Sequence, residues 1–373
     1  MEIGTITLIS FRNHNKTTLN FDPDLTVIWG KNGSGKTSVL EAIYNLSIGK
    51  SFKTNTKKEL IKEGEKNFII KGVFKDSQNI KKEVSYYQNK QGKRKIKINK
   101  KPILKRKDLI GLNNVVVFSP EEEKITKGYP KEKRQFFNKL FSICSKEYLN
   151  NLLVFNKILK QRNFLLKNNK KLSTNNIIEL LKPWNEKYIN ISINMWKQKQ
   201  GFLNDFKKLF NKTGREFDKE IEVQMVFEEN KETKESFQKK IEKNIHKEMI
   251  IKTTLFGPHK DNIDFLYKNK SLKKHGSQGE HKVFLAILKV AEILFINNKT
   301  QSSPIFLIDD LFANLDVDKS KRITTFLNET KKTKKIKLQT IITTTDILKL
   351  KKNMFFNNDN NIKKHKLVNG CKA

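Results

Sequence analysis

Short runs in which apolar and polar residues alternate dominate the first hundred positions of the chain. The clearest of these runs lie at 3–10, 18–21, 68–74, 82–87 and 95–98. Because successive side chains of a strand point to opposite faces, a period of two predicts half-buried β-strands. The continuous apolar run Val115–Phe118, stopped by Ser119 and Pro120, predicts a buried strand that ends at a turn. This part of the chain is therefore expected to be rich in β-structure.

The pattern changes from Glu121 to about Thr213, where apolar residues recur every three or four positions, as in long helices. A strand is then expected at 222–227 and a further helix near 234–245, and sheet-like sequence returns at 263–266, 304–308 and 337–342. This order predicts an α/β protein whose sheet-forming core is split by a helical insertion. The insertion has neither the length nor the sustained heptad pattern of a long coiled-coil arm.

The stretch 30–37 reads Gly-Lys-Asn-Gly-Ser-Gly-Lys-Thr and lies between an apolar run at 25–29 and a helical pattern. This is the phosphate-binding loop, whose glycines let backbone N–H groups point at phosphates in front of a helix N-terminus. Lys36 is expected to reach the β- and γ-phosphates and Thr37 to bind Mg²⁺. The strand before and the helix after favour a nucleoside triphosphate site over a plain turn. The predicted binding residues are Gly30, Lys31, Asn32, Gly33, Ser34, Gly35, Lys36, Thr37 and Ser38.

A second part of the nucleotide site is predicted at Asp309 and Asp310, which end the apolar run 304–308. Ligands of parallel sheets bind at the carboxyl ends of strands, so Asp309 is expected near Mg²⁺. Asp310 is expected to orient the water that attacks the γ-phosphate, and its short side chain suggests slow hydrolysis. The alternative is that the pair only caps a helix. The candidate catalytic residues are thus Lys36, Asp309 and Asp310, and the candidate metal ligands are Thr37 and Asp309.

Ser277, Gln278 and Gly279 open another helical pattern and form a second potential anion site. With Glu280, the same serine also fits a capping box. Since one chain does not need two γ-phosphate sites for one nucleotide, we expect this segment to bind the ATP of a second copy in a sandwich dimer. Two other positions are expected near the shared nucleotides: Asp316 in a loop facing the partner copy, and Thr344 as a γ-phosphate sensor.

The chain is strongly basic, with 76 Lys and Arg against 39 Asp and Glu and a formal net charge of +37. Such an excess favours a polyanionic partner, because bound lysines release counterions from phosphates. Nearly all of the positive charge is lysine, accompanied by many asparagines and isoleucines, and an AT-rich coding sequence also produces this profile. Each basic run taken alone is typical of a solvated surface. Together the runs make nucleic acid the leading candidate partner.

Other classes of protein are disfavoured. Cys144 and Cys371 lie far apart without ligand spacing, so neither a disulfide framework nor a zinc site is predicted. The first residues do not resemble a signal peptide, and the richest apolar stretch, 283–296, is too short and too charged to span a bilayer. A cytoplasmic protein without a membrane partner is expected. The length of 373 residues suits two or three domains.

With these motifs in place, the chain resembles the RecF family of ABC-type ATPases, which is related to the structural-maintenance-of-chromosomes heads. Besides the phosphate loop with Glu41-Ala42-Ile43-Tyr44, the matching segments are Phe11-Arg12-Asn13, Gly49-Lys50-Ser51-Phe52-Lys53-Thr54, Val117-Phe118-Ser119-Pro120-Glu121, Lys127-Gly128-Tyr129-Pro130, Gln161-Arg162-Asn163, Gly257-Pro258-His259, Ser277-Gln278-Gly279-Glu280, Asp309-Asp310 and Thr343-Thr344-Thr345-Asp346. The Gln-Arg-Asn and Gly-Pro-His segments matter most, because generic ABC ATPases lack them. Departures from the family pattern are Lys53, Lys260 and Lys282, where arginine is usual, and Asn138, where aspartate is expected.

The resemblance implies an ABC-type P-loop ATPase head with a β-rich flank, split by an α-helical insertion. The expected parts are residues 1–120 and 246–352 for the head, 121–245 for the mainly helical insertion domain (lobe II), and 353–373 for a basic C-terminal tail. Arg12 is expected to reach the nucleotide from the end of the first strand, with a local salt bridge as the alternative. His259 is interpreted as structural.

The resemblance also implies an ATP-dependent homodimer on double-stranded or gapped DNA that helps RecO and RecR load recombinase onto single-stranded gaps. Weak, DNA-stimulated ATP hydrolysis would release this dimer. Two rival hypotheses stay open. The chain could be the motor subunit of a membrane transporter, which would share both nucleotide motifs, or a structural dimer without turnover, if Asp310 does not position water.

Overall fold

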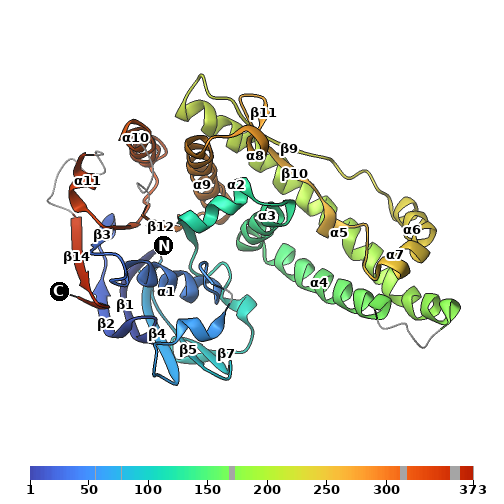
Figure 1. Cartoon of the computed structure of the whole chain (residues 1–373), viewed down its shortest axis with the longest axis horizontal. Helices are drawn as coiled ribbons and strands as arrows, with labels where there is room; N and C mark the ends of the chain where they lie inside the picture. The colour runs from blue at the N-terminus through green and yellow to red at the C-terminus, as the bar shows by residue number, and fades with distance from the viewer. Residues whose placement is uncertain (55, 77, 168–172, 311–316, 353–361, 373) are drawn as a thin grey trace.

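The computed structural model describes residues 1–54, 56–76, 78–167, 173–310, 317–352 and 362–372. Within these ranges the chain forms two six-stranded sheets, a three-stranded sheet and a projecting helical arm (Figure 1). The two large sheets form the head, and the arm leaves it on one side. The α/β class and the order of elements expected from the sequence pattern are confirmed.

The core sheet has the strand order β15-β14-β3-β13-β12-β8. Its strands are β3 (Leu25–Trp29), β8 (Val115–Phe118), β12 (Ile305–Asp309), β13 (Thr340–Thr344), β14 (Ile362–Val368) and β15 (Cys371–Lys372). All neighbouring pairs from β14 to β8 are parallel. Because the strands run in one direction, the carboxyl ends of β3, β12 and β13 meet at one edge of the sheet.

The second sheet is antiparallel, and helix α1 (Lys36–Ile48) packs against strands of both large sheets. Its strands, in spatial order, are β2 (His14–Asn20), β1 (Glu2–Phe11), β4 (Asn67–Lys75), β5 (Lys81–Asn89), β6 (Arg94–Ile98) and β7 (Lys101–Ile103). Every residue of α1 from Val39 to Ile48 is buried. These residues lie on all sides of the helix, and the polar ones among them are Glu41, Asn45 and Ser47. Burial on both sides fixes α1, and the loop before it, relative to the core sheet.

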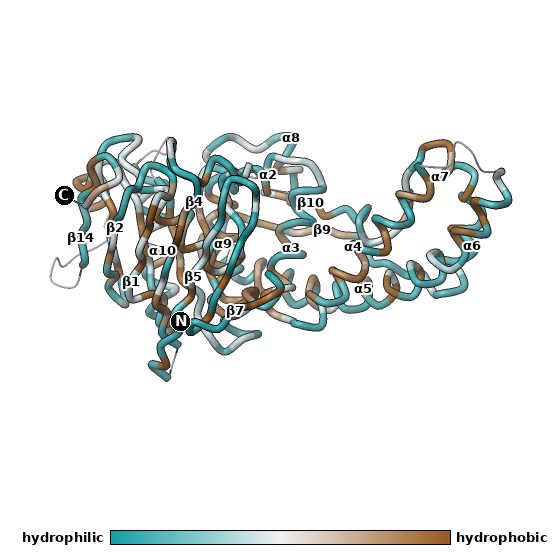
Figure 2. The backbone as a smooth tube through the Cα atoms, turned by 90° about the horizontal axis from the view of Figure 1, so that it is seen from below, coloured by the Kyte–Doolittle hydropathy of each residue, from teal (hydrophilic) through white to brown (hydrophobic). Residues whose placement is uncertain are grey.

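The helical arm consists mainly of α4 (Lys146–Lys167) and α5 (Thr174–Phe217), which run side by side away from the head (Figures 1 and 2). Rings of the arm and of α3 (Pro130–Cys144) pack on α9 (Gln278–Thr300) at its base. There the ring of Phe206 lies 5.4 Å from that of Phe295. This aromatic cluster connects the arm to the helix that begins at Ser277.

Shorter elements complete the fold. They are α2 (Lys124–Lys127), α6 (Lys234–Lys243), α7 (Ile245–Ile251), α8 (Leu272–His275), α10 (Val317–Thr333) and α11 (Ile347–Lys352), the 3₁₀ turns η1 (Lys57–Leu60), η2 (Arg106–Leu109), η3 (Pro120–Glu123) and η4 (Pro258–Lys260), and the three-stranded sheet of β9 (Val223–Phe227), β10 (Ile263–Tyr267) and β11 (Lys270–Ser271).

The structure differs from the expected domain layout in two places. The basic tail expected at 353–373 contains β14, which pairs in parallel with β3. Its lysines alternate with the buried His365 and Leu367, so the alternation of a strand is present. The high lysine content made this segment resemble a charged tail instead. In addition, β9 from the expected insertion pairs with β10 from the expected head, so the sheet crosses the boundary placed at 245/246. Strand pairing between distant segments overrides a boundary drawn from local pattern.

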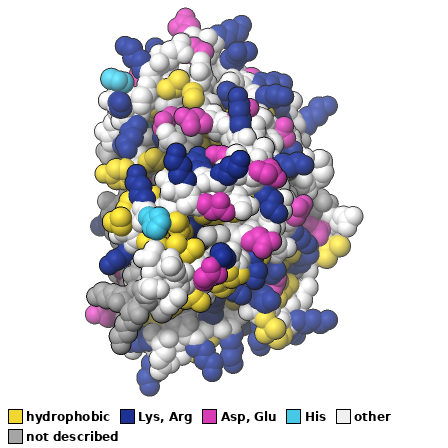
Figure 3. Space-filling view, turned by 90° about the vertical axis from the view of Figure 1, so that its right-hand side faces the viewer, with side chains coloured by type: hydrophobic (Ala, Val, Ile, Leu, Met, Phe, Trp, Pro, Cys, Tyr) yellow, Lys and Arg dark blue, Asp and Glu magenta, His cyan; other side chains and the backbone are white. Residues whose placement is uncertain are grey.

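Figure 3 shows the end of the arm, where Lys and Arg side chains are spread among acidic and apolar ones instead of forming a single patch. Among the helices of the described ranges, none has both the length and the apolar character needed to cross a membrane.

Candidate nucleotide-binding site

The phosphate loop connects β3 to α1 and depends on glycine at two positions where another residue would collide with the backbone or a side chain. Gly30 has a φ of +154°, and a Cβ there would lie 2.4 Å from the carbonyl oxygen of Leu367 in β14. Gly35 has a φ of +96°, and a Cβ there would lie 2.7 Å from Nε2 of His14. Only glycine accepts both the conformation and the close approach. The loop is thereby held against β2 and β14.

Lys36, at the start of α1, reaches back across the loop. Its Nζ donates to the carbonyl oxygens of Gly30 and Lys31, each at 2.8 Å. Burial lowers the pKa of Lys36, while the nearby charges of Asp310 and Asp309 act in the opposite direction. The ammonium group therefore lies at the mouth of the loop, where phosphate oxygens would replace the two carbonyls.

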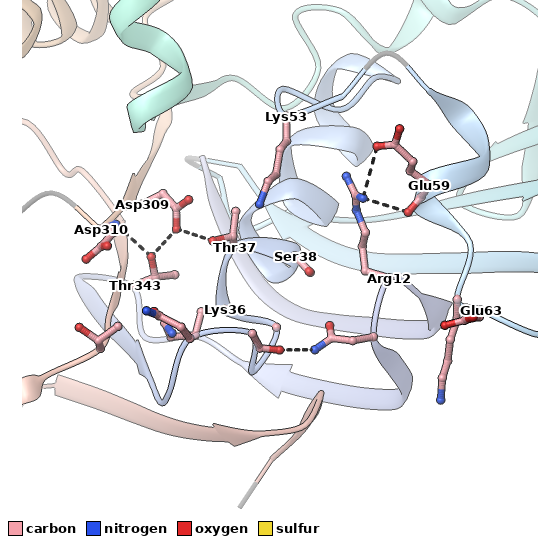
Figure 4. Close-up of a pocket in the computed structure, with 16 residues that line it drawn as sticks. Arg12, Lys36, Thr37, Ser38, Lys53, Glu59, Glu63, Asp309, Asp310 and Thr343 are labelled. Atoms are coloured by element: carbon pink, nitrogen blue, oxygen red, sulfur yellow. Dashed lines mark hydrogen bonds and ion pairs between the residues drawn. The ribbon is translucent and has the colours of Figure 1, made fainter. Parts of the chain in front are cut away.

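Asp309 and Thr37 come together although they lie on different elements. The Thr37 hydroxyl donates to Oδ1 of Asp309 at 2.9 Å, and the Thr343 hydroxyl donates to the same oxygen at 2.6 Å (Figure 4). Burial raises the pKa of Asp309, although both hydroxyl hydrogen bonds lower it. A hydroxyl and a carboxylate at this separation fit Mg²⁺, which prefers oxygen ligands and usually keeps several of its waters. The predicted metal ligands are thus adjacent.

Asp310 follows directly at the carboxyl end of β12. Its backbone has a φ of +46°, an uncommon value for a residue other than glycine, and its N–H donates to the Thr343 hydroxyl at 3.2 Å. Asp310 lines the same cavity as Asp309. Both acids predicted from the sequence therefore border the cavity of the phosphate loop, and Asp309 points toward Thr37 (Figure 4).

These residues line a cavity of about 530 Å³, a size suited to a nucleotide. Nine of the sequence-predicted residues line it: Arg12, Asn32, Gly33, Gly35, Lys36, Thr37, Ser38, Asp309 and Asp310. Gly30 and Lys31 contribute the carbonyls that hold Lys36, and Ser34 is the buried serine of the loop. The two nucleotide motifs thus form one site.

Arg12 takes part in the pocket through the local salt bridge that was its alternative interpretation. Its Nε and Nη2 each donate to the Glu41 carboxylate at 2.8 Å, and its Nη1 donates to the carbonyl of Glu59 at 3.0 Å. The Glu41 side chain is almost fully buried. The guanidinium group therefore bridges β1, α1 and η1 while its side chain borders the cavity.

In the segment that follows β12 in the sheet, Thr343 and Thr345 line the cavity, whereas Thr344 between them does not. The Thr344 hydroxyl is turned away, donating to the carbonyl of Asp346. Thr344 stays a prediction within the segment 343–346, and its side chain lies on the other face from Thr343 because side chains alternate along β13. Sequence reasoning also missed five lining residues: Asn13, Lys53, Glu59, Lys62 and Glu63. Of these, Asn13 and Lys53 stand in segments that carry the family resemblance, which is the signal that could have identified them.

Ser277 and Gln278 lie outside this cavity. Ser277 caps α9, with both hydrogen bonds of a capping box to Glu280 formed. Ser277 and Gln278 are exposed at the start of a 23-residue helix. Gly279 lies against Lys319, and a Cβ on Gly279 would be 3.0 Å from Nζ of Lys319. None of these three residues lines the site of its own chain. Asp316 lies outside the described residues.

The Gln-Arg-Asn segment lies in the arm, away from the nucleotide site. The Arg162 guanidinium is completely buried and forms an ion pair with Glu248. It also donates to Oδ1 of Asn185 at 2.8 Å and to the Thr254 hydroxyl at 2.7 Å. Arg162 therefore ties α4 and α5 to α7 and the loop that follows it.

The Gly-Pro-His segment completes this connection. Nδ1 of His259 lies 3.3 Å from the Tyr188 hydroxyl, and its Nε2 lies 3.1 Å from the carbonyl of Thr254. Burial is the main cause that lowers the pKa of His259 to about 4, so the ring is neutral at pH 7. These contacts are those of a structural residue.

Comparison with known proteins agrees with this geometry. The family model of the RecF/RecN/SMC N terminal domain matches residues 2–372. The DNA replication and repair protein RecF of Geotalea daltonii is 32% identical over 356 residues, covering 93% of this chain and 94% of that protein. RecF of Ruminiclostridium cellulolyticum is 33% identical over 359 residues, with 93% of each covered.

Solved structures show the same relationship. A structure of the recombination mediator protein RecF with ATP, in the RecFOR pathway, matches with a TM-score of 0.87 and 25% identity, covering 100% of this chain and 96% of that chain. An Smc head domain from Pyrococcus furiosus shares the fold, with a TM-score of 0.59 and 17% identity over 99% of this chain and 94% of the other. The chain therefore belongs to the RecF family.

Proposed function

We propose that this protein binds ATP with Mg²⁺ and that two copies close around two nucleotides on double-stranded or gapped DNA. The observation that carries the proposal is the position of Ser277 and Gln278, which are exposed at a long helix start and absent from the cavity of their own chain. A helix N-terminus presents backbone N–H groups that suit a phosphate. A second copy would supply the γ-phosphate of its ATP to these groups.

Within one chain, each residue of the cavity has a distinct task. Lys36 would exchange its two carbonyl partners for phosphate oxygens. Thr37 and Asp309 would hold Mg²⁺, which offsets the charge of the phosphates when it is bound. Asp310 would orient the attacking water, because its side chain borders the cavity at the end of β12.

Hydrolysis would act as the release step. A dimer closed around two γ-phosphates is stabilised only in the triphosphate state, so cleavage shifts the population back to monomers. The enzyme activity we propose is thus a weak, DNA-stimulated ATPase that regulates DNA binding. The short Asp310 side chain is consistent with slow turnover.

The proposed partners follow from charge and family. A net charge of +37 favours a polyanion, and the RecF relatives are described as proteins of DNA replication and repair. The RecFOR pathway of the RecF–ATP structure supports RecO and RecR as partners in loading recombinase onto single-stranded gaps. With this role we expect the protein to act in the cytoplasm. The alternative of a transporter motor subunit finds no support among the relatives described above.

Sedimentation velocity tests this proposal. The protein is compared without nucleotide, with ATP, and with ATP plus a gapped duplex, using an intact duplex of equal length as the second DNA. We expect a monomer without ATP, a dimer with ATP, and co-sedimentation of that dimer with DNA. A monomer under all conditions would refute the sandwich. Stimulation of ATP turnover by duplex DNA would support the clamp, and stimulation only by a membrane subunit would revive the transporter alternative.

A further inference from the structure

The head contains a second cavity, of about 100 Å³, besides the nucleotide site. Residues between positions 50 and 62 line both cavities, but no single residue of the described ranges lines the two together. Three cationic side chains line the second one: Lys50, Arg94 and Arg106. None of them belongs to the nucleotide site described above.

The fold brings these three cations together from separate elements. Gly49 ends α1 in the left-handed conformation, with a φ of +71°. A Cβ there would lie 2.6 Å from Cγ of Arg106, so the absence of a side chain lets the stem of Arg106 cross the helix end. Lys50 follows directly. Arg94 stands on the same face of β6 as the buried Ile96 and therefore points toward the cavity.

Like charges dominate the cavity. In the described part of the chain, none of the three cations forms an ion pair with a carboxylate. Burial, and then the charge of Arg94, lowers the pKa of Arg106. Burial, and then the charge of Arg106, lowers the pKa of Lys50. Arg106 thus interacts unfavourably with both of the other cations, and an anion between them would offset this repulsion.

Neutral polar groups complete the lining. Asn45 is only 1% exposed and lines the cavity, and its Oδ1 has no hydrogen-bond partner among the residues that the structure describes. The Tyr86 hydroxyl interacts with the guanidinium group of Arg94. Because Oδ1 of Asn45 only accepts hydrogen bonds, the guest that satisfies it must offer a donor, such as the O–H of a protonated phosphate or of a water beside the phosphate.

We propose that this cavity binds one phosphate group between Arg94, Arg106 and Lys50. Guanidinium groups present a planar pair of donors that matches phosphate oxygens, and lysine adds a point charge. A volume of about 100 Å³ holds roughly three waters at about 30 Å³ each, which is room for one phosphate but not for a nucleotide. The phosphate belongs either to a free ion or to a nucleic-acid backbone, and the site does not depend on dimerisation.

The test compares two double variants of equal charge. Arg94→Gln with Arg106→Gln removes two cations of the cavity. Lys95→Gln with Lys97→Gln removes two exposed cations from the other face of the same strand. Unchanged circular dichroism and ATP binding establish that each variant folds. If the first variant fails this check, Arg94→Gln alone, a change of an exposed side chain, is compared with Lys95→Gln.

In the first arm, thermal unfolding is followed against inorganic phosphate at constant ionic strength with saturating ADP and Mg²⁺, so that the phosphate loop is filled in every protein. We expect the phosphate concentration for half-maximal stabilisation to rise about tenfold or more in the cavity variant only. In the second arm, duplex DNA binding is measured against salt. A fall of about one in the slope of log K against log salt, again only in the cavity variant, identifies a backbone phosphate.

Loss of the phosphate response with an unchanged DNA slope identifies a free phosphate ion. Equal behaviour of cavity and control variants in both arms overturns the proposal. If the wild type binds no DNA at all, the proposed DNA function fails. The first arm, with inorganic phosphate, then still shows whether the cavity binds phosphate.

Discussion

The Thr37 hydroxyl donates to Oδ1 of Asp309 at 2.9 Å and so joins two residues that are 272 positions apart. Thr37 stands at the start of α1, and Asp309 ends β12. The same carboxylate oxygen accepts from Thr343 at the end of β13. One oxygen atom thus links the phosphate loop to the edge of the core sheet. This contact joins the two motifs of the nucleotide site.

Replacing Asp309 with asparagine should separate metal binding from nucleotide binding. The amide oxygen can still accept from Thr37 and Thr343, but the charge for Mg²⁺ is lost. We expect ATP affinity to fall about tenfold or more with Mg²⁺ and much less with EDTA. Calorimetric titration in both conditions measures this, with the exposed Asp318→Asn as the control. Equal losses with and without Mg²⁺ would contradict a role in metal binding.

Asp310→Asn should slow hydrolysis without weakening ATP binding. Asparagine tolerates the left-handed backbone seen here, with its φ of +46°, so the fold should persist. We expect the single-turnover rate to fall on the order of 100-fold, a typical effect of losing a group that transfers or orients a proton. Equal rates in the wild type and the variant would remove Asp310 from the mechanism and favour a structural dimer.

Ser277→Arg should abolish ATP-dependent dimerisation while leaving ATP binding by the monomer nearly intact. The substitution places a bulky cation at the exposed start of α9 and also removes a helix cap. Ser173→Arg is the control for the loss of a cap, since the exposed Ser173 caps α5 by accepting from the N–H of Asn176. Sedimentation measures ATP-dependent dimerisation, and nucleotide titration measures ATP binding by the monomer. If Ser277→Arg lost both properties together, the assignment to the ATP of a partner copy would be wrong.

Arg162→Ala should destabilise the protein severely. The substitution leaves the fully buried Glu248 without its partner, and breaking such a pair costs about 3–5 kcal/mol. The control is Arg322→Ala, which removes a half-exposed ion pair with Asp218 and should cost about 1 kcal/mol or less. Denaturant unfolding measures both. Similar midpoints for the two variants would show that the buried network contributes little.

Stability should fall between about pH 6.5 and pH 4 because of His259. Its pKa in the folded protein is lowered to about 4, mainly by burial, so the unfolded chain takes up the proton first as the pH falls. The stabilisation is present above the unfolded pKa, declines through this window, and amounts to about 3 kcal/mol at most. Denaturant midpoints at pH 7 and pH 5 check it. His259→Gln should lose less stability than the wild type over this step, and an equal loss would assign the effect to other groups.

The nucleotide site was predictable wherever its chemistry is local in sequence. The phosphate loop, Lys36 and Thr37 lie within eight consecutive positions, and Asp309 and Asp310 end a recognisable apolar run. Thr344, which does not line the cavity, shows the limit of this reasoning. A shift of one residue along β13 exchanges the faces of the strand, and only pairing with β12 and β3 sets that register.

The position of Arg12 and the strand β14 were decided by contacts between distant segments. Arg12 finds its partner Glu41 on α1, and a single sequence contains no signal for that pairing. Strand β14 is rich in lysine, and its place beside β3 depends on the backbone of that neighbour. Backbone pairing is nearly independent of side-chain type, so charge alone did not reveal it.

The sequence by itself determined the ligand class, because a phosphate loop is built from backbone conformations that its own glycines permit. It also determined the α/β class, since the period of apolar residues reflects burial on one face or on all sides. Only the tertiary structure decided which hydroxyls meet Asp309, which cation is tied to Glu41, and that Lys50, Arg94 and Arg106 share a cavity. These relationships join residues far apart in the chain, and the packing of sheets and helices brings them within contact.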